Sequence, residues 1–113
     1  MNKLLVVLVL AFFFVSCETR TYDEISGVAI SNPTYVANIK PIVTVNCLEC
    51  HSSGIQYPNL ETYDEVKEQI INGNLLCRIS GQSCGDRMPL GGQLPQNQIE
   101  AITLWSQNGF INQ

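Results

Sequence analysis

The residues best suited to chemistry in this sequence are Cys47, Cys50 and His51, in the run Cys47-Leu48-Glu49-Cys50-His51. Two thiols three positions apart can each add to one vinyl group of the same porphyrin, and the next residue, an imidazole, then lies over the iron. The C-x-x-C-H spacing therefore predicts one covalently bound haem c as cofactor. Cys47 and Cys50 would be its thioether anchors, and His51 would be the proximal axial ligand of the metal.

Two other uses of a C-x-x-C pair compete with haem attachment. The pair could be a thioredoxin-like redox site, or it could be half of a zinc site completed by Cys77 and Cys84. No βαβ pattern surrounds Cys47 and Cys50, however. Six residues separate Cys77 from Cys84, where about two to four are usual between paired zinc ligands. A zinc- or disulfide-stabilised exported binding module is therefore the weaker alternative.

The second axial position of such an iron also needs a ligand. The sequence contains one histidine and two methionines, and one of these methionines is Met1. Met88 lies in the Gly-rich stretch GDRMPLGGQLP, which has no helical or strand periodicity and is expected to be a loop. We expect Met88 to be the second axial ligand; the alternative is a packed loop residue beside an open or water-bound iron.

The N-terminal residues predict export. A positive residue, Lys3, is followed by twelve apolar residues from Leu4 to Val15, long enough for a signal peptide and too short for an ordinary membrane span. The end of this stretch, Phe-Val-Ser-Cys, resembles the lipobox of bacterial lipoprotein signal peptides. Residues 1–16 are then the signal peptide, and Cys17 carries lipid and anchors the protein to the membrane, facing the periplasm. The alternative is an ordinary cleaved signal that leaves Cys17 as a spare thiol.

Charge excludes nucleic acid as a partner. Removal of Lys3 with the signal peptide leaves five Lys and Arg residues against ten Asp and Glu residues, because only one of the six basic residues is lost. Binding of phosphates needs clustered Lys and Arg, and the sequence has no such cluster. The polar residues 17–33 are expected to be a tether, with one domain from residue 34 to residue 113.

A helix is expected directly before the C-x-x-C-H motif. Val36, Ile39 and Val43 follow one another at i, i+3 and i+7, which places them on one helical face that leads into Cys47. Pro41 lies inside this pattern, so we expect either a kink or a second helix that starts there.

A second helix is expected to begin after the polar loop of residues 52–59. Thr62 and Glu65 form a capping box, and Asn72-Gly73 supplies the stop. The apolar face of this helix would be made by Tyr63, Val66 and Ile70. Four acidic residues gather around its start, where the helix dipole favours them, so we interpret them as a solvated helix end and not as catalytic carboxylates: Glu61, Asp64, Glu65 and Glu68.

Cys77 and Cys84 are the two cysteines left once haem and lipid are assigned. In an oxidising compartment a disulfide between them is the default expectation. Closing this eight-residue loop would stabilise the fold by about 2.5 kcal/mol in the chain-entropy model. It would also stiffen the segment directly before Met88.

The last predicted helix runs from about Gln96 to Gln107, with Pro95 at its start and Asn108-Gly109 at its end. Ile99, Ile102 and Trp105 are expected to belong to the core. Trp105 should pack against the first helix or against the haem edge, because an aromatic side chain of this size usually anchors a small core.

Taken together, these motifs resemble those of small bacterial monohaem class I cytochromes c. The matching features are the helix before CLECH, the MPLGG loop, and the ending IEAITLWSQNGF, and they cover about residues 34–110. The resemblance implies an all-α fold, with three to four short helices around one haem whose edge reaches the surface.

The function that these ligands imply is one-electron transfer and not enzymatic catalysis. An iron ligated by His51 and Met88 can change oxidation state without binding a small-molecule substrate, and thioether ligation raises its potential towards that of a respiratory chain. We expect a monomer that docks transiently with redox partner proteins. The alternatives are a haem enzyme or gas sensor in which Met88 leaves the iron open, and an accessory subunit of one larger complex.

Overall fold

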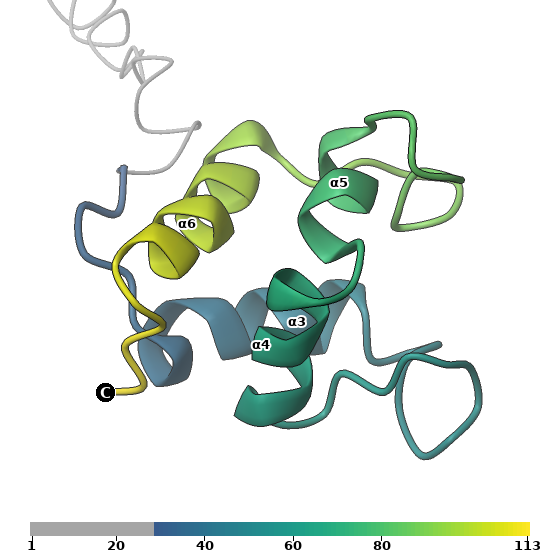
Figure 1. Ribbon diagram of the computed structural model, residues 1–113, viewed down its shortest axis with the longest axis horizontal. Coiled ribbons are helices and arrows are strands. Elements are labelled where there is room, and N and C mark those ends of the chain that lie inside the picture. Colours follow the sequence, from purple (N-terminus) through teal and green to yellow (C-terminus); the bar gives the residue numbers. More distant parts are fainter. Residues whose placement is uncertain (1–28) are drawn as a thin grey trace, which may run out of the picture.

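The computed structural model describes residues 29–113, and in this range the chain forms helices and no strands (Figure 1). The expected all-α class is therefore confirmed. The predicted signal peptide, the lipidated Cys17 and most of the tether lie outside the described residues. Among the residues described, no helix combines the length and apolar character needed to cross a membrane. The elements are η2 (Tyr35–Ile39), α3 (Lys40–Asn46), α4 (Tyr63–Ile71), α5 (Leu75–Ser80) and α6 (Gln96–Gln107).

The helix before the C-x-x-C-H motif changes type next to Pro41. Its first turn, η2, is a π-helix in which the Lys40 N–H donates to the Tyr35 carbonyl, and α3 follows with Pro41 in its first turn. Proline has no N–H to donate and is tolerated at the start of an α-helix. Of the two expected outcomes, a second helix starting at this proline is the one observed.

The apolar face of this first helical segment differs from the prediction at one position. Ile39 and Val43 are buried, as expected, but Val36 is 51% exposed and Tyr35 is only 5% exposed. Tyr35 and Ile39 lie four residues apart on the buried face, so the prediction was wrong in placing Val36 there. The Val36 N–H instead pairs with the carbonyl of Asn112, at 3.1 Å, in the C-terminal tail.

Helix α4 begins with the predicted capping box. The Glu65 N–H donates to the Thr62 hydroxyl at 3.3 Å, and the Thr62 N–H donates to the Glu65 carboxylate at 2.9 Å. These two hydrogen bonds satisfy amides that the first turn would otherwise leave without partners. The helix ends at Ile71 and is capped by Asn72, so it stops at the predicted Asn72-Gly73, and Val66 on its inner face is fully buried.

Helix α5 was not expected from the sequence. It is six residues long and is capped at its C-terminus by Gly81, which adopts a left-handed conformation with φ of 70°. Glycine adopts this conformation without the steric cost that a side chain would bring. Ile79 on its inner face is buried, and the helix carries Cys77 and Arg78 into the region before Met88.

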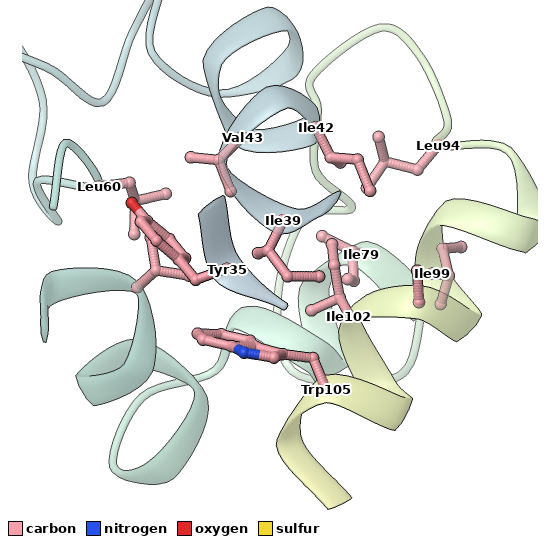
Figure 2. Packing of buried hydrophobic residues seen from close by; sticks show 12 residues of the cluster. Tyr35, Ile39, Ile42, Val43, Leu60, Ile79, Leu94, Ile99, Ile102 and Trp105 are labelled. Atoms are coloured by element: carbon pink, nitrogen blue, oxygen red, sulfur yellow. The ribbon is translucent and has the colours of Figure 1, made fainter. Parts of the chain in front are cut away.

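Helix α6 has the predicted bounds, and Trp105 fixes it to the start of the domain. The Trp105 ring is fully buried and lies 5.7 Å from the Tyr35 ring and 5.0 Å from the Phe110 ring, measured between centroids. Its indole N–H donates to the Ile111 carbonyl at 2.8 Å. Figure 2 shows Trp105 next to Tyr35 and Ile39 of η2. Packing against the first helix, one of the two expected positions, is therefore confirmed.

One hydrophobic core joins all the helices to the loops that flank the C-x-x-C-H and Met88 segments (Figure 2). Its buried members are Tyr35, Ile39, Ile42, Val43, Leu60, Val66, Ile79, Leu94, Ile99, Ala101, Ile102 and Trp105. Leu60 and Leu94 come from loops, which shows that both loops are anchored to the same core as the helices.

Candidate cofactor site

The four residues expected to hold a haem border one cavity. This cavity has a volume of about 760 Å³, and Cys47, Cys50, His51 and Met88 all line it. Ligand and cofactor pockets in proteins usually measure about 300–1,000 Å³, so the cavity has the size of a cofactor site. The structure thus brings Met88 to the cavity that the C-x-x-C-H motif borders, although the loop that carries it is remote in sequence.

The interior of the cavity is largely apolar. Six of its lining residues are buried members of the core and come from four helices and two loops: Val43, Leu60, Val66, Ile79, Leu94 and Ile102. An apolar wall excludes water, and a large apolar ring is stabilised by contact with such a wall. The cavity is therefore suited to a flat, mostly hydrophobic group.

A turn at the end of α3 positions the three residues of the C-x-x-C-H motif. The Cys47 N–H donates to the Val43 carbonyl at 2.8 Å, and the N–H groups of Cys50 and His51 both donate to the Cys47 carbonyl, at 3.2 Å and 2.9 Å. Both thiols are free; Cys47 is half-buried and Cys50 is exposed. The motif therefore offers two unpaired thiols and one imidazole from a single hydrogen-bonded turn.

The Cys47 thiol differs from the thiols of redox enzymes. Burial raises its pKa to about 11, so the thiol is protonated at neutral pH. Thioredoxin-like sites work in the opposite way, because their reactive cysteine has a lowered pKa and forms a thiolate. This environment disfavours the thioredoxin-like alternative.

The His51 ring is oriented by the polypeptide backbone. Its Nδ1 atom lies 2.8 Å from the carbonyl oxygen of Pro58. A carbonyl can only accept a hydrogen bond, so Nδ1 must carry the proton, and the lone pair of the neutral ring is then on Nε2. Histidines that bind metals are commonly held in this way, because the hydrogen bond selects the tautomer and makes the ligating nitrogen more basic. The neutral His51 ring would therefore present Nε2 as its ligating atom.

Met88 lies in the loop between α5 and α6, as predicted, and is half-buried. Its backbone N–H donates to the Arg78 carbonyl at 3.1 Å, which ties the loop to α5. Its thioether sulfur is a soft, neutral donor of the kind that binds haem iron and does not require deprotonation.

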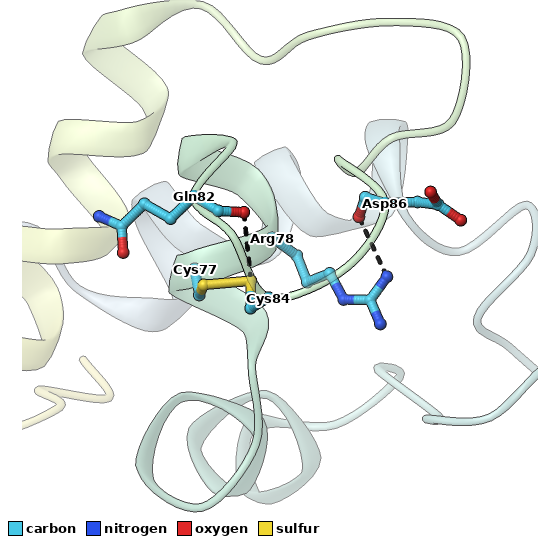
Figure 3. The surroundings of a disulfide bond; sticks show 5 residues. All are labelled: Cys77, Arg78, Gln82, Cys84 and Asp86. Carbon is cyan, nitrogen blue, oxygen red and sulfur yellow. Dashed lines mark hydrogen bonds between the residues drawn. A yellow bond between two sulfur atoms is a disulfide. The ribbon is translucent and has the colours of Figure 1, made fainter.

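The predicted disulfide reinforces this connection (Figure 3). Cys77 on α5 is bonded to Cys84, with their Cα atoms 6.2 Å apart. The Arg78 guanidinium donates to the Asp86 carbonyl at 3.0 Å. It also lies so close to Gly85 that a Cβ atom there would come within 2.6 Å of it. Residues 84–86 are thus held on α5 by a covalent bond and a hydrogen bond just before Met88.

The disulfide also bears on the zinc alternative. Because Cys77 and Cys84 are bonded to each other, they are not free to complete a site with Cys47 and Cys50. Within residues 29–113, no group of three or more His, Cys, Asp or Glu side chains is arranged to hold a metal ion.

The acidic residues near the start of α4 serve different purposes. Glu65 accepts the hydrogen bonds of the capping box, and donation from the Thr62 backbone is the largest cause of the lowered pKa of its carboxyl group. The interpretation of this residue as part of a helix cap is therefore confirmed. Glu68, in contrast, borders the cavity together with Glu49 and Asp86.

Two contributors to the site were missed by sequence reasoning. The role of the Pro58 carbonyl, which accepts from His51, could not be predicted from the sequence, because every residue has a carbonyl group. Arg78 was not predicted either, although an arginine beside a cysteine in a loop-rich segment could have indicated a residue that ties that segment down.

No protein-family model matches this chain, and no curated protein or solved structure matches it significantly.

Proposed function

We propose that this protein is a one-electron carrier with a single covalently attached haem c, and that its helices form a class I cytochrome c-like fold. The observation that carries the proposal is the common cavity lined by Cys47, Cys50, His51 and Met88. Two thiols, an imidazole and a thioether are the set of side chains needed to attach a haem and to fill both axial positions of its iron.

The residues around the cavity fit such a group. Cys47 and Cys50 would form the thioether bonds, and His51 and Met88 would ligate the iron. When bound, haem supplies an iron that alternates between the ferric and ferrous states. The hydrogen bond to Pro58 places the proton of the neutral His51 ring on Nδ1, which leaves Nε2 as the atom that would ligate the iron. The apolar walls exclude water and keep the surroundings of the cofactor nearly unchanged when an electron arrives or leaves.

Electron transfer explains this site better than catalysis does. His51, the chain's only histidine, is oriented as a ligand, so no other imidazole is present to serve as general acid or base. A thioether ligand favours ferrous iron and raises the potential. We therefore place the carrier in or near a respiratory chain, where it would dock transiently, as a monomer, with redox partner proteins.

The cellular position that we propose follows from the sequence of the first 17 residues. An export signal that ends at Cys17 would bring the chain to the periplasmic side of a membrane, where haem attachment of this type and disulfide formation both take place. Lipid on Cys17 would keep the carrier at the membrane surface, and residues 18–33 would give the domain room to meet its partners.

The mass of the exported protein tests the proposal. After extraction with acidified acetone, which removes non-covalent haem, the intact mass should still include one haem. The double variant Cys47→Ala/Cys50→Ala should lose it. The matched control is Cys77→Ala/Cys84→Ala, which removes the same number of cysteines and should keep the haem. Complete loss of haem from the unaltered protein on extraction would overturn the proposal.

A further inference from the structure

The loop between His51 and α4 is anchored near its C-terminal end, where Leu60 is buried in the core and donates its N–H to the His51 carbonyl at 2.9 Å. Its apolar side chains Ile55 and Tyr57 are 71% and 86% exposed. They cannot fix the position of the neighbouring Pro58, whose carbonyl oxygen accepts the His51 Nδ1 proton. The peptide that carries this carbonyl is held from its C-terminal side, by the buried Leu60 and by the side chain of Asn59.

The side chain of Asn59 holds this peptide through three hydrogen bonds. The Pro58 carbonyl belongs to the peptide bond between Pro58 and Asn59, so the position of Asn59 determines where the acceptor oxygen lies. The Asn59 side-chain amide donates to Glu61 Oε2 at 2.9 Å and to Glu65 Oε1 at 3.3 Å. Its amide oxygen accepts from the Gly54 N–H at 3.3 Å. Both ends of the amide are therefore engaged, and they join the loop to the start of α4.

The carboxylates that hold Asn59 are themselves fixed. Glu65 lies in the first turn of α4 and accepts from the N–H groups of Glu61 and Thr62, each at 2.9 Å. Glu61 Oε2 also accepts from the Ser53 N–H at 3.0 Å. The two carboxylates at the cap of α4 are thus held in place by backbone N–H groups. Hydrogen bonds connect them through Asn59 to the Pro58–Asn59 peptide, whose carbonyl accepts from His51.

We propose that Asn59 is a positioning residue for His51. Through its hydrogen bonds to the N-terminal cap of α4, Asn59 would fix the Pro58 carbonyl and thereby the orientation and basicity of the imidazole. The effect of Asn59 on the reduction potential rests on the proposed haem function. A hydrogen bond from Nδ1 makes Nε2 a stronger donor, and a stronger donor favours ferric iron. Loss of Asn59 would weaken the bond to Pro58 and raise the reduction potential.

Replacement of Asn59 by alanine tests this role without changing the charge of the protein. Two quantities are measured on the exported full-length chain: the exchange rate of the His51 Nδ1 proton, by NMR, and the midpoint potential. We expect exchange to become about tenfold faster. We also expect the ratio of ferrous to ferric protein at a given potential to rise by up to about tenfold, which corresponds to about 59 mV for a one-electron couple. Asn59→Gln keeps the amide and should restore part of both effects.

Two further variants separate positioning from charge and from general destabilisation. Glu61→Ala removes an acceptor and a charge, whereas Glu61→Gln removes the charge and keeps an amide oxygen that can still accept. Proton exchange should therefore be faster in the alanine variant than in the glutamine variant. The matched control is Gln96→Ala on α6, which loses an exposed amide-to-carboxylate bond of 3.1 Å to Glu100 and should leave both quantities unchanged.

The proton exchange rate and the midpoint potential of these variants can contradict the positioning role of Asn59. If Asn59→Ala lowers stability but leaves proton exchange and potential at the values of the unaltered protein, Asn59 only closes the loop and the inference is wrong. Equal changes in Gln96→Ala would also overturn it. The inference and the proposed function fail separately, because the exchange rate of the His51 proton can be measured in a chain that carries no haem.

Discussion

The backbone N–H of Met88 donates to the carbonyl oxygen of Arg78 at 3.1 Å, so the loop that carries the thioether is attached to α5 directly at the methionine. A flexible methionine side chain gains little rigidity from its own rotamers. The attachment of its backbone, together with the disulfide at Cys77 directly before Arg78, limits where the sulfur can lie. This arrangement suits a ligand that must stay bound in two oxidation states.

Replacement of Met88 by alanine should open the second axial position. The unaltered oxidised protein should show the weak far-red charge-transfer band of thioether-ligated iron, and its reduced form should bind carbon monoxide slowly or not at all. The variant should lose the band, bind carbon monoxide readily and have a lower midpoint potential, because the ligand that favours ferrous iron is gone.

Gln93→Ala, an exposed position in the same loop, is the control for the Met88 variant and should behave like the unaltered protein. Immediate binding of carbon monoxide by the unaltered protein, with no far-red band, would show that Met88 is not a ligand. The enzyme or gas-sensor alternative would then be the better interpretation.

The Cys77–Cys84 disulfide should stabilise the fold without being needed for haem attachment. Cys77→Ala/Cys84→Ala should lower the free energy of unfolding by about 2.5 kcal/mol, the chain-entropy estimate for a loop of this length. Denaturant titration of the oxidised proteins measures the difference. Thiol labelling of the denatured, unreduced protein should modify neither cysteine, and full labelling of either one would show that the disulfide is absent.

The capping box should contribute measurably to the stability of α4. Thr62→Ala removes the hydroxyl that accepts from the Glu65 N–H and should lower the free energy of unfolding by about 1 kcal/mol. Thr44→Ala on α3 is a matched control, because its exposed hydroxyl only donates to the Lys40 carbonyl within the helix. Alanine favours helices, so this control should cost little or nothing. Equal losses in the two variants would contradict a specific role for the cap.

The contribution of Glu65 should depend on pH with a definite sign. Hydrogen bonds from Thr62, Asn59 and Glu61 lower the pKa of this carboxyl group in the folded chain. A lowered pKa means that the carboxylate stabilises the fold above the unfolded value of about 4.3. This stabilisation is lost as the pH falls through the folded pKa. The difference in stability between the unaltered protein and Glu65→Gln should therefore be constant near neutral pH and shrink in acid. A difference that grows on acidification would contradict this assignment.

Cys17→Ser should release the protein from the membrane fraction. The lipid that we propose at this cysteine is the only anchor in the proposal, since no helix among residues 29–113 could span a bilayer. Fractionation of broken cells, followed by immunoblotting, compares the variant with the unaltered protein. An unaltered protein that is already free of membranes would show that Cys17 carries no anchor.

Features encoded by local chemistry could be predicted from the sequence. The capping box of α4 depends on residues three positions apart, and the bounds of α6 follow from Pro95 and Asn108-Gly109. The loop character of Met88 also follows from its glycine and proline neighbours. These signals act over a few residues, so no tertiary information was needed.

Features that depend on distant contacts could not be predicted. Val36 fits the apolar pattern of the first helix, but its N–H pairs with a carbonyl 76 residues further along the chain, and it lies at the surface. Helix α5 is too short to form on its own and is held by the disulfide and by the buried Ile79. The acceptor for His51 is a backbone carbonyl, whose role depends only on how the loop folds.

The C-terminal tail determines when the domain can finish folding as the chain passes through a membrane. The Ile111 carbonyl accepts from the Tyr35 N–H at 2.9 Å and from the Trp105 indole at 2.8 Å, so the last residues complete the first helical turn. A chain threaded through a membrane channel from its N-terminus cannot form these contacts until residue 111 has emerged. In the export that we propose, Cys47, Cys50 and His51 would therefore cross the membrane well before the domain can close. During that delay, haem could be attached to the two cysteines while the chain is still unfolded.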